Sequence, residues 1–156
     1  MTCSVVYARA ANVSLPLKID KSDVIAKVEV LSTTQVPGYR TTSVVALRPN
    51  RRAYRSQAEV KVIQSIKGLK AGEIYTLEFD NGLVCPNVEY QKGDQCLVFN
   101  TKLPNGHYET FNTYYGKYMV KENKVVAWKQ NAHQAITFDE VVNEITRIMQ
   151  TPKQPD

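Results

Sequence analysis

Residues 91–100, QKGDQCLVFN, decide the fold of this chain. The polar residues around Gly93 are typical of a turn. The run that follows, from Cys96 to Phe99, is apolar without alternation, which is typical of a β-strand buried on both faces. We therefore expect residues 95–99 to form a central strand.

Three earlier stretches alternate between apolar and polar residues, as half-buried strands do. They lie at 22–32, 57–68 and 73–79 and are rich in β-branched and aromatic residues, which favour strands. The residues expected to face inward are Val24, Ala26, Val28, Val30, Ala58, Val60, Val62, Tyr75, Leu77 and Phe79. Two later stretches, 107–120 and 124–129, predict two more strands joined by a hairpin.

Turns and one helix complete the pattern. Residues 103–108, LPNGHY, contain Asn105-Gly106, a strong hairpin signal. Residues 37–56 predict a hairpin that projects beyond the core. Residues 136–149 predict a helix with Thr137 and Glu140 as a capping box and an apolar stripe that must pack on the sheet. Its hydrophobic staple would join Ile136 to Val141.

The length of 156 residues favours one domain, which we place at 1–150, followed by a disordered tail at 151–156. The short strands, glycine-containing turns and final helix predict a mostly β fold, a small closed or partly closed barrel. The net charge of +5 favours anionic partners without identifying one. No segment approaches the roughly 20 apolar residues of a membrane span. The chain is either cytosolic or, as we favour, an exported domain without its leader.

The three cysteines allow three interpretations. Zinc is disfavoured because Cys3, Cys85 and Cys96 show no close pair, and the two histidines have no ligand spacing. A nucleophile is disfavoured: Cys96 lies in an apolar strand, while Cys85, at the end of a predicted strand, is the more accessible of the two. Structural sulfur remains, and either Cys85–Cys96 or Cys3–Cys85 could form the one bridge.

The order of these features resembles the netrin-like domain and the N-terminal domain of the tissue inhibitors of metalloproteinases. The resemblance covers residues 3–113: a cysteine near the N-terminus, SDVIAKVEVL, VKVIQSIKG, YTLEF, LVCPN and YQKGDQCLVF. It implies an OB-fold, a five-stranded Greek-key barrel that is usually secreted, here with an extended hairpin and a C-terminal α-helix packed on it. It also implies a bridge between Cys3 and Cys85, with Cys96 left as a core thiol.

This resemblance leads to the first functional hypothesis, an exported binding module whose partner is a protein and whose partner class includes proteases. The contact residues would be Met1, Thr2, Cys3 and Ser4, although the same segment could merely seal one end of the barrel. In the metalloproteinase inhibitors the first cysteine chelates the zinc of the protease. Met1 stands at that position here, and the rest of that family's cysteine pattern is missing. The hairpin and helix of residues 116–149 look more like stand-alone bacterial relatives.

The second hypothesis is that the barrel binds a polyanion, an oligosaccharide or a nucleic acid. The hairpin tip contains Arg48, Arg51, Arg52, Tyr54 and Arg55. Arginine neutralises phosphate or sulfate, and an aromatic ring can stack on a base or sugar. Such turns are also common as solvated tips. Tyr108, Tyr114, Tyr115 and Tyr118 could form a stacking platform, but core packing explains them equally simply.

An enzyme is the third hypothesis and the least supported. The sequence has no paired carboxylates at a meaningful spacing, no phosphate-binding loop and no triad pattern. His107 and His133 lie in polar surroundings and are interpreted as surface residues. We therefore expect no catalytic residues, no metal and no cofactor.

Overall fold

The structure, a computed structural model, describes residues 13–36, 53–82, 88–111, 113–128 and 136–152. At positions 53–55, 80–82 and 113–114 only the backbone is described. The helices and strands are, in chain order, α1 (Leu15–Lys21), β1 (Val24–Gln35), β2 (Ala53–Lys67), β3 (Ile74–Gly82), β4 (Gln95–Lys102), β5 (Tyr108–Thr110), the 3-10 helix η2 (Thr113–Gly116), β6 (Lys117–Lys121), β7 (Lys124–Val125), β8 (Ile136–Thr137) and α2 (Phe138–Gln150).

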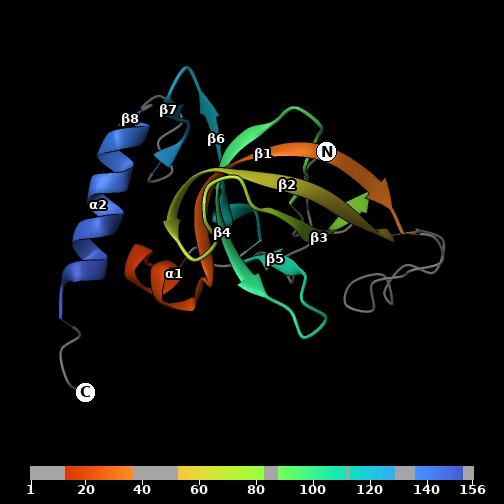
Figure 1. Ribbon diagram of the computed structural model, residues 1–156, viewed down its shortest axis with the longest axis horizontal. Coiled ribbons are helices and arrows are strands. Elements are labelled where there is room, and N and C mark those ends of the chain that lie inside the picture. Colours follow the sequence, from red (N-terminus) through yellow and green to blue (C-terminus); the bar gives the residue numbers. More distant parts are fainter. Residues whose placement is uncertain (1–12, 37–52, 83–87, 112, 129–135, 153–156) are drawn as a thin grey trace, which may run out of the picture.

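Five strands close into a barrel (Figure 1). β1 pairs with β2, β2 with β3, β3 with β5, β5 with β4, and β4 returns to β1. All of these pairings are antiparallel except that of β3 with β5. This strand order is that of the OB-fold. The predicted fold class, a five-stranded barrel with a C-terminal helix packed on it, is therefore confirmed.

The inside of the barrel is filled by the alternating residues that the sequence predicts. All ten predicted positions on β1, β2 and β3 are buried there, and they share one apolar core with Cys96 and Val98 of β4. Because successive side chains of a strand point to opposite faces, Leu97 and Phe99 must then lie outside the barrel.

A second core covers that outside, and we call it the outer core. Leu97 and Phe99 are fully buried in it, together with Ile25 of β1. The residues packed against them come from later elements and from α1: Ile19, Val120, Val125, Trp128, Phe138, Val141 and Ile145. β4 is thus buried on both faces, as the run from Cys96 to Phe99 predicts.

Helix α2 begins as its sequence predicts. The side chain of Thr137 accepts a hydrogen bond from the backbone N–H of Glu140 (3.3 Å), and the Glu140 carboxylate accepts one from the backbone N–H of Thr137 (3.2 Å). These two bonds complete the capping box. Helix α1 was not predicted, because seven residues that include Pro16 give too short a pattern to distinguish a helix from a loop.

The stretch predicted as one strand at 107–120 is two strands, β5 and β6, separated by η2. Gly116 ends this 3-10 helix, and a Cβ at this position would collide with the backbone oxygen of Phe111. The following hairpin is confirmed: Glu122 and Asn123 both have positive φ, as the two-residue turn between β6 and β7 requires.

The pairing of β1 with β2 continues to Gln35 opposite Ser56, and that of β2 with β3 to Ala53 opposite Gly82. The tip of the predicted hairpin, residues 37–52, lies outside the described residues, as do residues 153–156 of the predicted tail. Within the described ranges, no helix combines the length and the hydropathy needed to cross a membrane.

Candidate functional site

The outside of the barrel has two unlike sides. One side carries the outer core under α1 and α2. The other, which we call the open face, is formed by outward-pointing residues of β2, β3 and β5: Gln57, Glu59, Lys61, Ile63, Ile74, Thr76, Glu78 and Glu109. None of them is buried, so this side is in contact with solvent.

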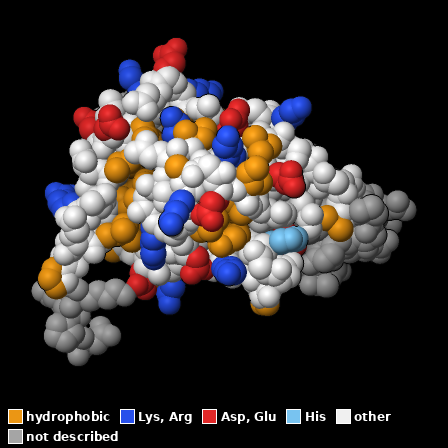
Figure 2. All heavy atoms as spheres, viewed as in Figure 1, with side chains coloured by type: hydrophobic (Ala, Val, Ile, Leu, Met, Phe, Trp, Pro, Cys, Tyr) orange, Lys and Arg blue, Asp and Glu red, His pale blue; other side chains and the backbone are white. Residues whose placement is uncertain are grey.

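The open face combines charged and apolar groups. Ile74 stands opposite Lys61 in the β2–β3 register, and Ile63 is its diagonal neighbour on the same face. Their side chains are 58% and 38% exposed, among the highest values for large apolar residues here. Figure 2 shows hydrophobic side chains at the surface between acidic and basic ones. A protein partner can cover a surface of this kind, because protein interfaces also combine apolar and polar groups.

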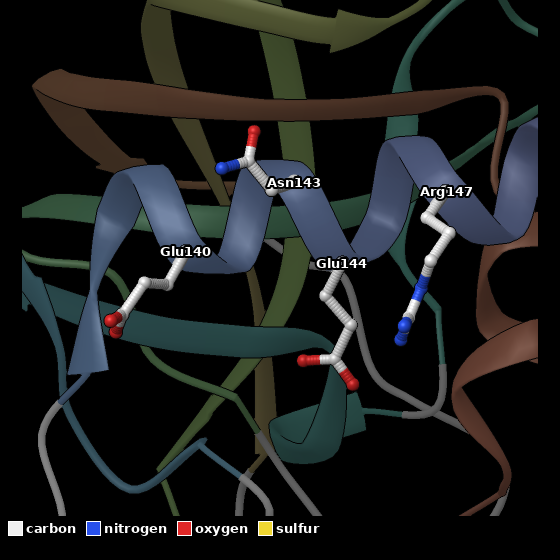
Figure 3. Close-up of a pocket in the computed structure, with 4 residues that line it drawn as sticks. All are labelled: Glu140, Asn143, Glu144 and Arg147. Carbon is white, nitrogen blue, oxygen red and sulfur yellow. The ribbon is translucent and has the colours of Figure 1, made fainter.

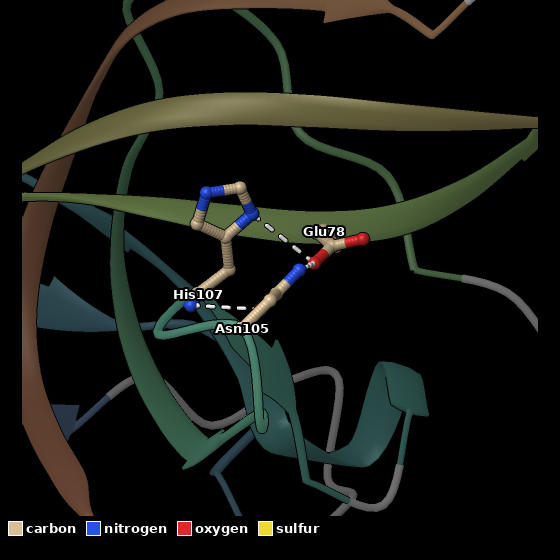
Figure 4. Close-up of polar contacts among 3 residues, drawn as sticks. All are labelled: Glu78, Asn105 and His107. Atoms are coloured by element: carbon tan, nitrogen blue, oxygen red, sulfur yellow. Dashed lines mark hydrogen bonds and ion pairs between the residues drawn. The ribbon is translucent and has the colours of Figure 1, made fainter.

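A polar cluster of Glu78, Asn105 and His107 (Figure 4) lies where β3 pairs with β5, at the end of the open face away from Ile74. One carboxylate oxygen of Glu78 accepts a hydrogen bond from Asn105 Nδ2 (2.8 Å) and lies 3.1 Å from His107 Nδ1. The Asn105 side-chain oxygen accepts a further bond from the backbone N–H of His107 (3.0 Å). The three residues therefore hold one another in a fixed arrangement.

The loop between β4 and β5 positions this cluster. The backbone N–H of Leu103 donates to the oxygen of His107 (2.7 Å), and that of Gly106 donates to the oxygen of Leu103 (3.0 Å). Gly106 has a φ of +87°, which glycine adopts without strain. The turn that Asn105-Gly106 predicts is confirmed. In OB-folds this loop commonly adjoins the ligand-binding face.

Lys18 is a buried ammonium group on the opposite side of the molecule. Its side chain, only 3% exposed, links α1 to β6 and η2: Nζ donates to Tyr118 OH (2.7 Å) and to the backbone oxygen of Tyr115 (2.9 Å). Burial lowers the pKa of Lys18 to about 8. Because Lys18 is buried and donates both of these hydrogen bonds, it is better explained as a structural link than as a nucleophile.

The described thiol inside the barrel is not reactive. Cys96 is a free thiol with no exposed surface, and burial raises its pKa to about 12. A thiol in this state is not a nucleophile at neutral pH. Among the described residues, no group of three or more histidine, cysteine or acidic side chains is placed to hold a metal ion.

Two tyrosines of the predicted stacking platform, Tyr108 and Tyr118, pack in the two cores, and a third, Tyr115 of η2, is half-buried. Tyr108 packs edge-to-face against Tyr75 inside the barrel (5.0 Å between ring centres). Tyr118 packs against Trp128 in the outer core (4.8 Å). Core packing is thus the better account of both, while the side chain of Tyr114 lies outside the described residues.

Helix α2 borders an open hollow of about 360 Å³, lined by Glu140, Asn143, Glu144 and Arg147 (Figure 3). One of its groups, the Glu144 carboxylate, accepts a hydrogen bond from Trp128 Nε1 (3.1 Å). Glu140 completes the capping box. Both carboxylates thus have structural roles, and the hollow is a weaker candidate than the open face.

Most of the sequence-predicted site residues lie outside the described part of the chain. This applies to Met1, Thr2, Cys3 and Ser4, to Cys85 of the predicted disulfide, and to Arg48, Arg51 and Arg52. For Tyr54 and Arg55 the backbone alone is described: both belong to β2 and pair with Asn81 and Asp80 of β3. The structure therefore brings the end of the arginine-rich segment to one end of the β2–β3 ladder.

The charges of the chain are unevenly distributed along the sequence. Of twenty basic residues, five are arginines between positions 40 and 55, and no acidic residue lies between 36 and 58. The remainder of the chain has fifteen basic and fifteen acidic residues, so the entire net charge of +5 belongs to this one segment.

Sequence reasoning missed the polar cluster on the open face. His107 was interpreted as an isolated surface residue, but it contacts Glu78, which is 29 residues away. The pairing of β3 with β5 brings these two residues together, and no local sequence pattern predicts that pairing. No protein-family model matches this sequence, and no curated protein matches it either.

Proposed function

We propose that this chain is a binding module, not an enzyme, whose partner is a protein that docks on the open face. The observation that carries the proposal is the one-sided placement of the helices. Both α1 and α2 pack against the outer core, so the open face has Ile63 and Ile74 in solvent. In OB-folds the outer face of strands 2 and 3 is the common ligand site.

A protein suits this face better than a uniform polyanion. Among its described side chains, the face carries three carboxylates, those of Glu59, Glu78 and Glu109, against the ammonium group of Lys61. A nucleic acid or sulfated sugar laid along β2 and β3 would bring like charges together. A protein partner can instead present apolar groups to the isoleucines and basic groups to the carboxylates.

Export and a role for the N-terminal segment belong to this proposal and are supported by the sequence alone. The resemblance to the netrin-like domain favours a Cys3–Cys85 bridge, which would persist in an oxidising compartment. It also makes a protease the first partner class to test, with Met1 to Ser4 as a second contact. Mass spectrometry of unreduced, exported protein should find one disulfide, and free thiols at Cys3 and Cys85 would remove the argument for export.

The docking surface can be tested by affinity capture with matched variants. Ile74→Arg places a charge in the open face, while Asn143→Arg adds the same charge on the exposed side of α2. We expect wild type and Asn143→Arg to retain the same protein at pH 7.5 and Ile74→Arg to lose it. Equal retention by both variants, or no protein specific to the wild type, would contradict the proposal.

A second candidate function, polyanion binding by the arginine-rich segment, is favoured by the concentration of the net charge between positions 40 and 55. Here the contacts would be Arg48, Arg51, Arg52, Tyr54 and Arg55 at the end of the β2–β3 ladder. Replacing Arg48, Arg51 and Arg52 by alanine should then abolish retention on heparin at low salt. If the wild type is not retained on heparin or single-stranded DNA at low salt, this candidate is excluded.

A further inference from the structure

The orientation of His107 fixes what its outer nitrogen can do. An ionised carboxylate only accepts hydrogen bonds, so the contact with Glu78 requires the hydrogen on Nδ1. In the neutral ring Nε2 then has a lone pair and is an acceptor. In Figure 4 this second nitrogen points away from Glu78.

The outer nitrogen is available to a partner. The His107 side chain is 35% exposed, whereas that of Glu78 is 13% exposed. Within the described part of the chain, the one hydrogen bond of the His107 side chain is that between Nδ1 and Glu78. Among the described residues, Nε2 therefore has no hydrogen-bond partner, although its ring is held in place from the other side.

The charged groups around His107 determine whether a cationic or an anionic group of a partner is favoured beside it. Glu78 lies on β3 and Glu109 beside it on β5, and β2 contributes Glu59 and Lys61. Arg55 and Asp80, of which the backbone alone is described, form the pair two residues further along the β2–β3 ladder. The neighbouring outward residue of β4 is the uncharged Thr101, and Lys102 follows at the end of that strand. Among the described side chains of the open face, carboxylates thus outnumber ammonium groups, and a cationic donor is favoured over an anion.

Resting on the proposed function, we propose that His107 makes docking on the open face pH-dependent. The neutral ring accepts, on Nε2, a hydrogen bond from a lysine or arginine side chain of the partner, and protonation of the ring releases that side chain. Histidine is the residue type whose charge ordinarily changes between pH 5 and 8. Protonated His107 has donors on both nitrogens, so it loses the acceptor and repels the partner's cation.

The test uses a defined probe, an acetylated and amidated tetralysine peptide, titrated into isotope-labelled protein and followed by NMR. At pH 7.5 we expect shifts at Glu78, His107 and Glu109, and about tenfold weaker binding at pH 5.5, as for the loss of one charge-assisted hydrogen bond. His107→Gln keeps a hydrogen-bond acceptor but has no ionisable ring. The affinity of this variant for tetralysine should change less with pH than that of the wild type. The change that remains measures how much protonation of the carboxylates weakens binding.

Three results would overturn the inference. The first is tetralysine binding that does not shift these residues, and the second is equal affinity at both pH values. The third comes from the wild type alone: long-range ¹⁵N–¹H spectra at neutral pH should show the hydrogen on Nδ1, and a hydrogen on Nε2 would remove the acceptor. This third measurement holds even if His107→Gln lowers stability.

The inference and the proposed function can fail separately. In the capture experiment, loss of the partner with Ile74→Arg at pH 7.5 supports docking on the open face. If wild-type capture is then unchanged at pH 5.5, the role of His107 is wrong and the function stands. If Ile74→Arg captures the partner as well as wild type does, the function itself is wrong.

Discussion

On both outer sides of the barrel, alternate side chains of each strand point outward, but one side is covered by helices and the other is exposed to solvent. On β1 and β4 the outward residues Ile25, Leu97 and Phe99 are apolar, and two helices cover them. On β2, β3 and β5 the outward residues are mostly polar, and no described helix covers them. The alternation closes the barrel, and the outward residues decide which side is left for a partner.

The polar cluster sharpens this contrast. On the covered side, polar groups make structural hydrogen bonds: Lys18 donates to Tyr118 and to the backbone oxygen of Tyr115. On the open face, Glu78 and Asn105 hold His107 but leave its outer nitrogen without a described partner. We therefore expect substitutions on the covered side to change stability, and substitutions on the open face to change binding.

The largest effect on stability is expected for Phe99→Ala. Phe99 is fully buried in the outer core and lies beside the rings of Tyr118 and Trp128. Removing its ring should lower the free energy of unfolding by about 3–5 kcal/mol. Thr76→Ala on the open face is the control and should cost less than about 1 kcal/mol. Urea unfolding of the two variants checks this, and equal costs would remove the distinction between the sides.

A second prediction concerns the pH dependence of stability on the covered side. The pKa of Lys18 is about 8 in the folded chain and about 10.4 for an unperturbed lysine. Between these values the unfolded chain binds more protons, so the contribution of Lys18 raises stability as pH rises from about 8 to 10.4. The gain should be at most about 3 kcal/mol.

The measurement is the difference between wild type and Lys18→Met across pH 7–10.5. The difference is needed because burial raises the pKa values of Cys96 and Tyr118 to about 12 each, and these groups lower stability as the unfolded chain loses their protons. We expect the wild type to gain stability relative to the variant above pH 8. A constant difference over this range would show that Lys18 titrates normally.

The capping box gives a smaller effect at the edge of the outer core. Thr137→Ala removes the acceptor for the backbone N–H of Glu140 and should cost about 1 kcal/mol. Asn143→Ala, in the exposed middle of α2, should be neutral or slightly stabilising because alanine is the best helix former. Thermal unfolding compares the two, and equal melting temperatures would show that the cap contributes nothing.

Local pattern was sufficient for the barrel and insufficient for the site. The run from Cys96 to Phe99 predicted burial on both faces, because alternate residues of a strand point to opposite faces and all four residues are apolar. Thr137 and Glu140 predicted a cap because the interaction spans one helical turn. The Glu78–His107 contact spans 29 residues and depends on the register of β3 with β5, which no local pattern records.

Helix α1 and Lys18 show the same limit on the covered side. Lys18 reads as an ordinary charged residue in a short segment that contains a proline. Its burial results from packing α1 against residues about 100 positions later, where Tyr118 accepts its hydrogen bond. The period-two patterns thus predicted the strands, while packing between distant elements determined the buried lysine.

The smallest effect on stability is expected on the open face, and it tests the comparison most directly. Ile74 is more than half exposed, so Ile74→Arg should lower the free energy of unfolding by less than about 1 kcal/mol, mainly through repulsion by Lys61 opposite it. Chemical unfolding of this variant, measured beside the capture experiment, separates folding from docking. A folded variant that no longer captures the partner would assign Ile74 to binding. A loss of several kcal/mol would instead mean that this side of the barrel is covered in solution, and that the two sides are more alike than their exposure indicates.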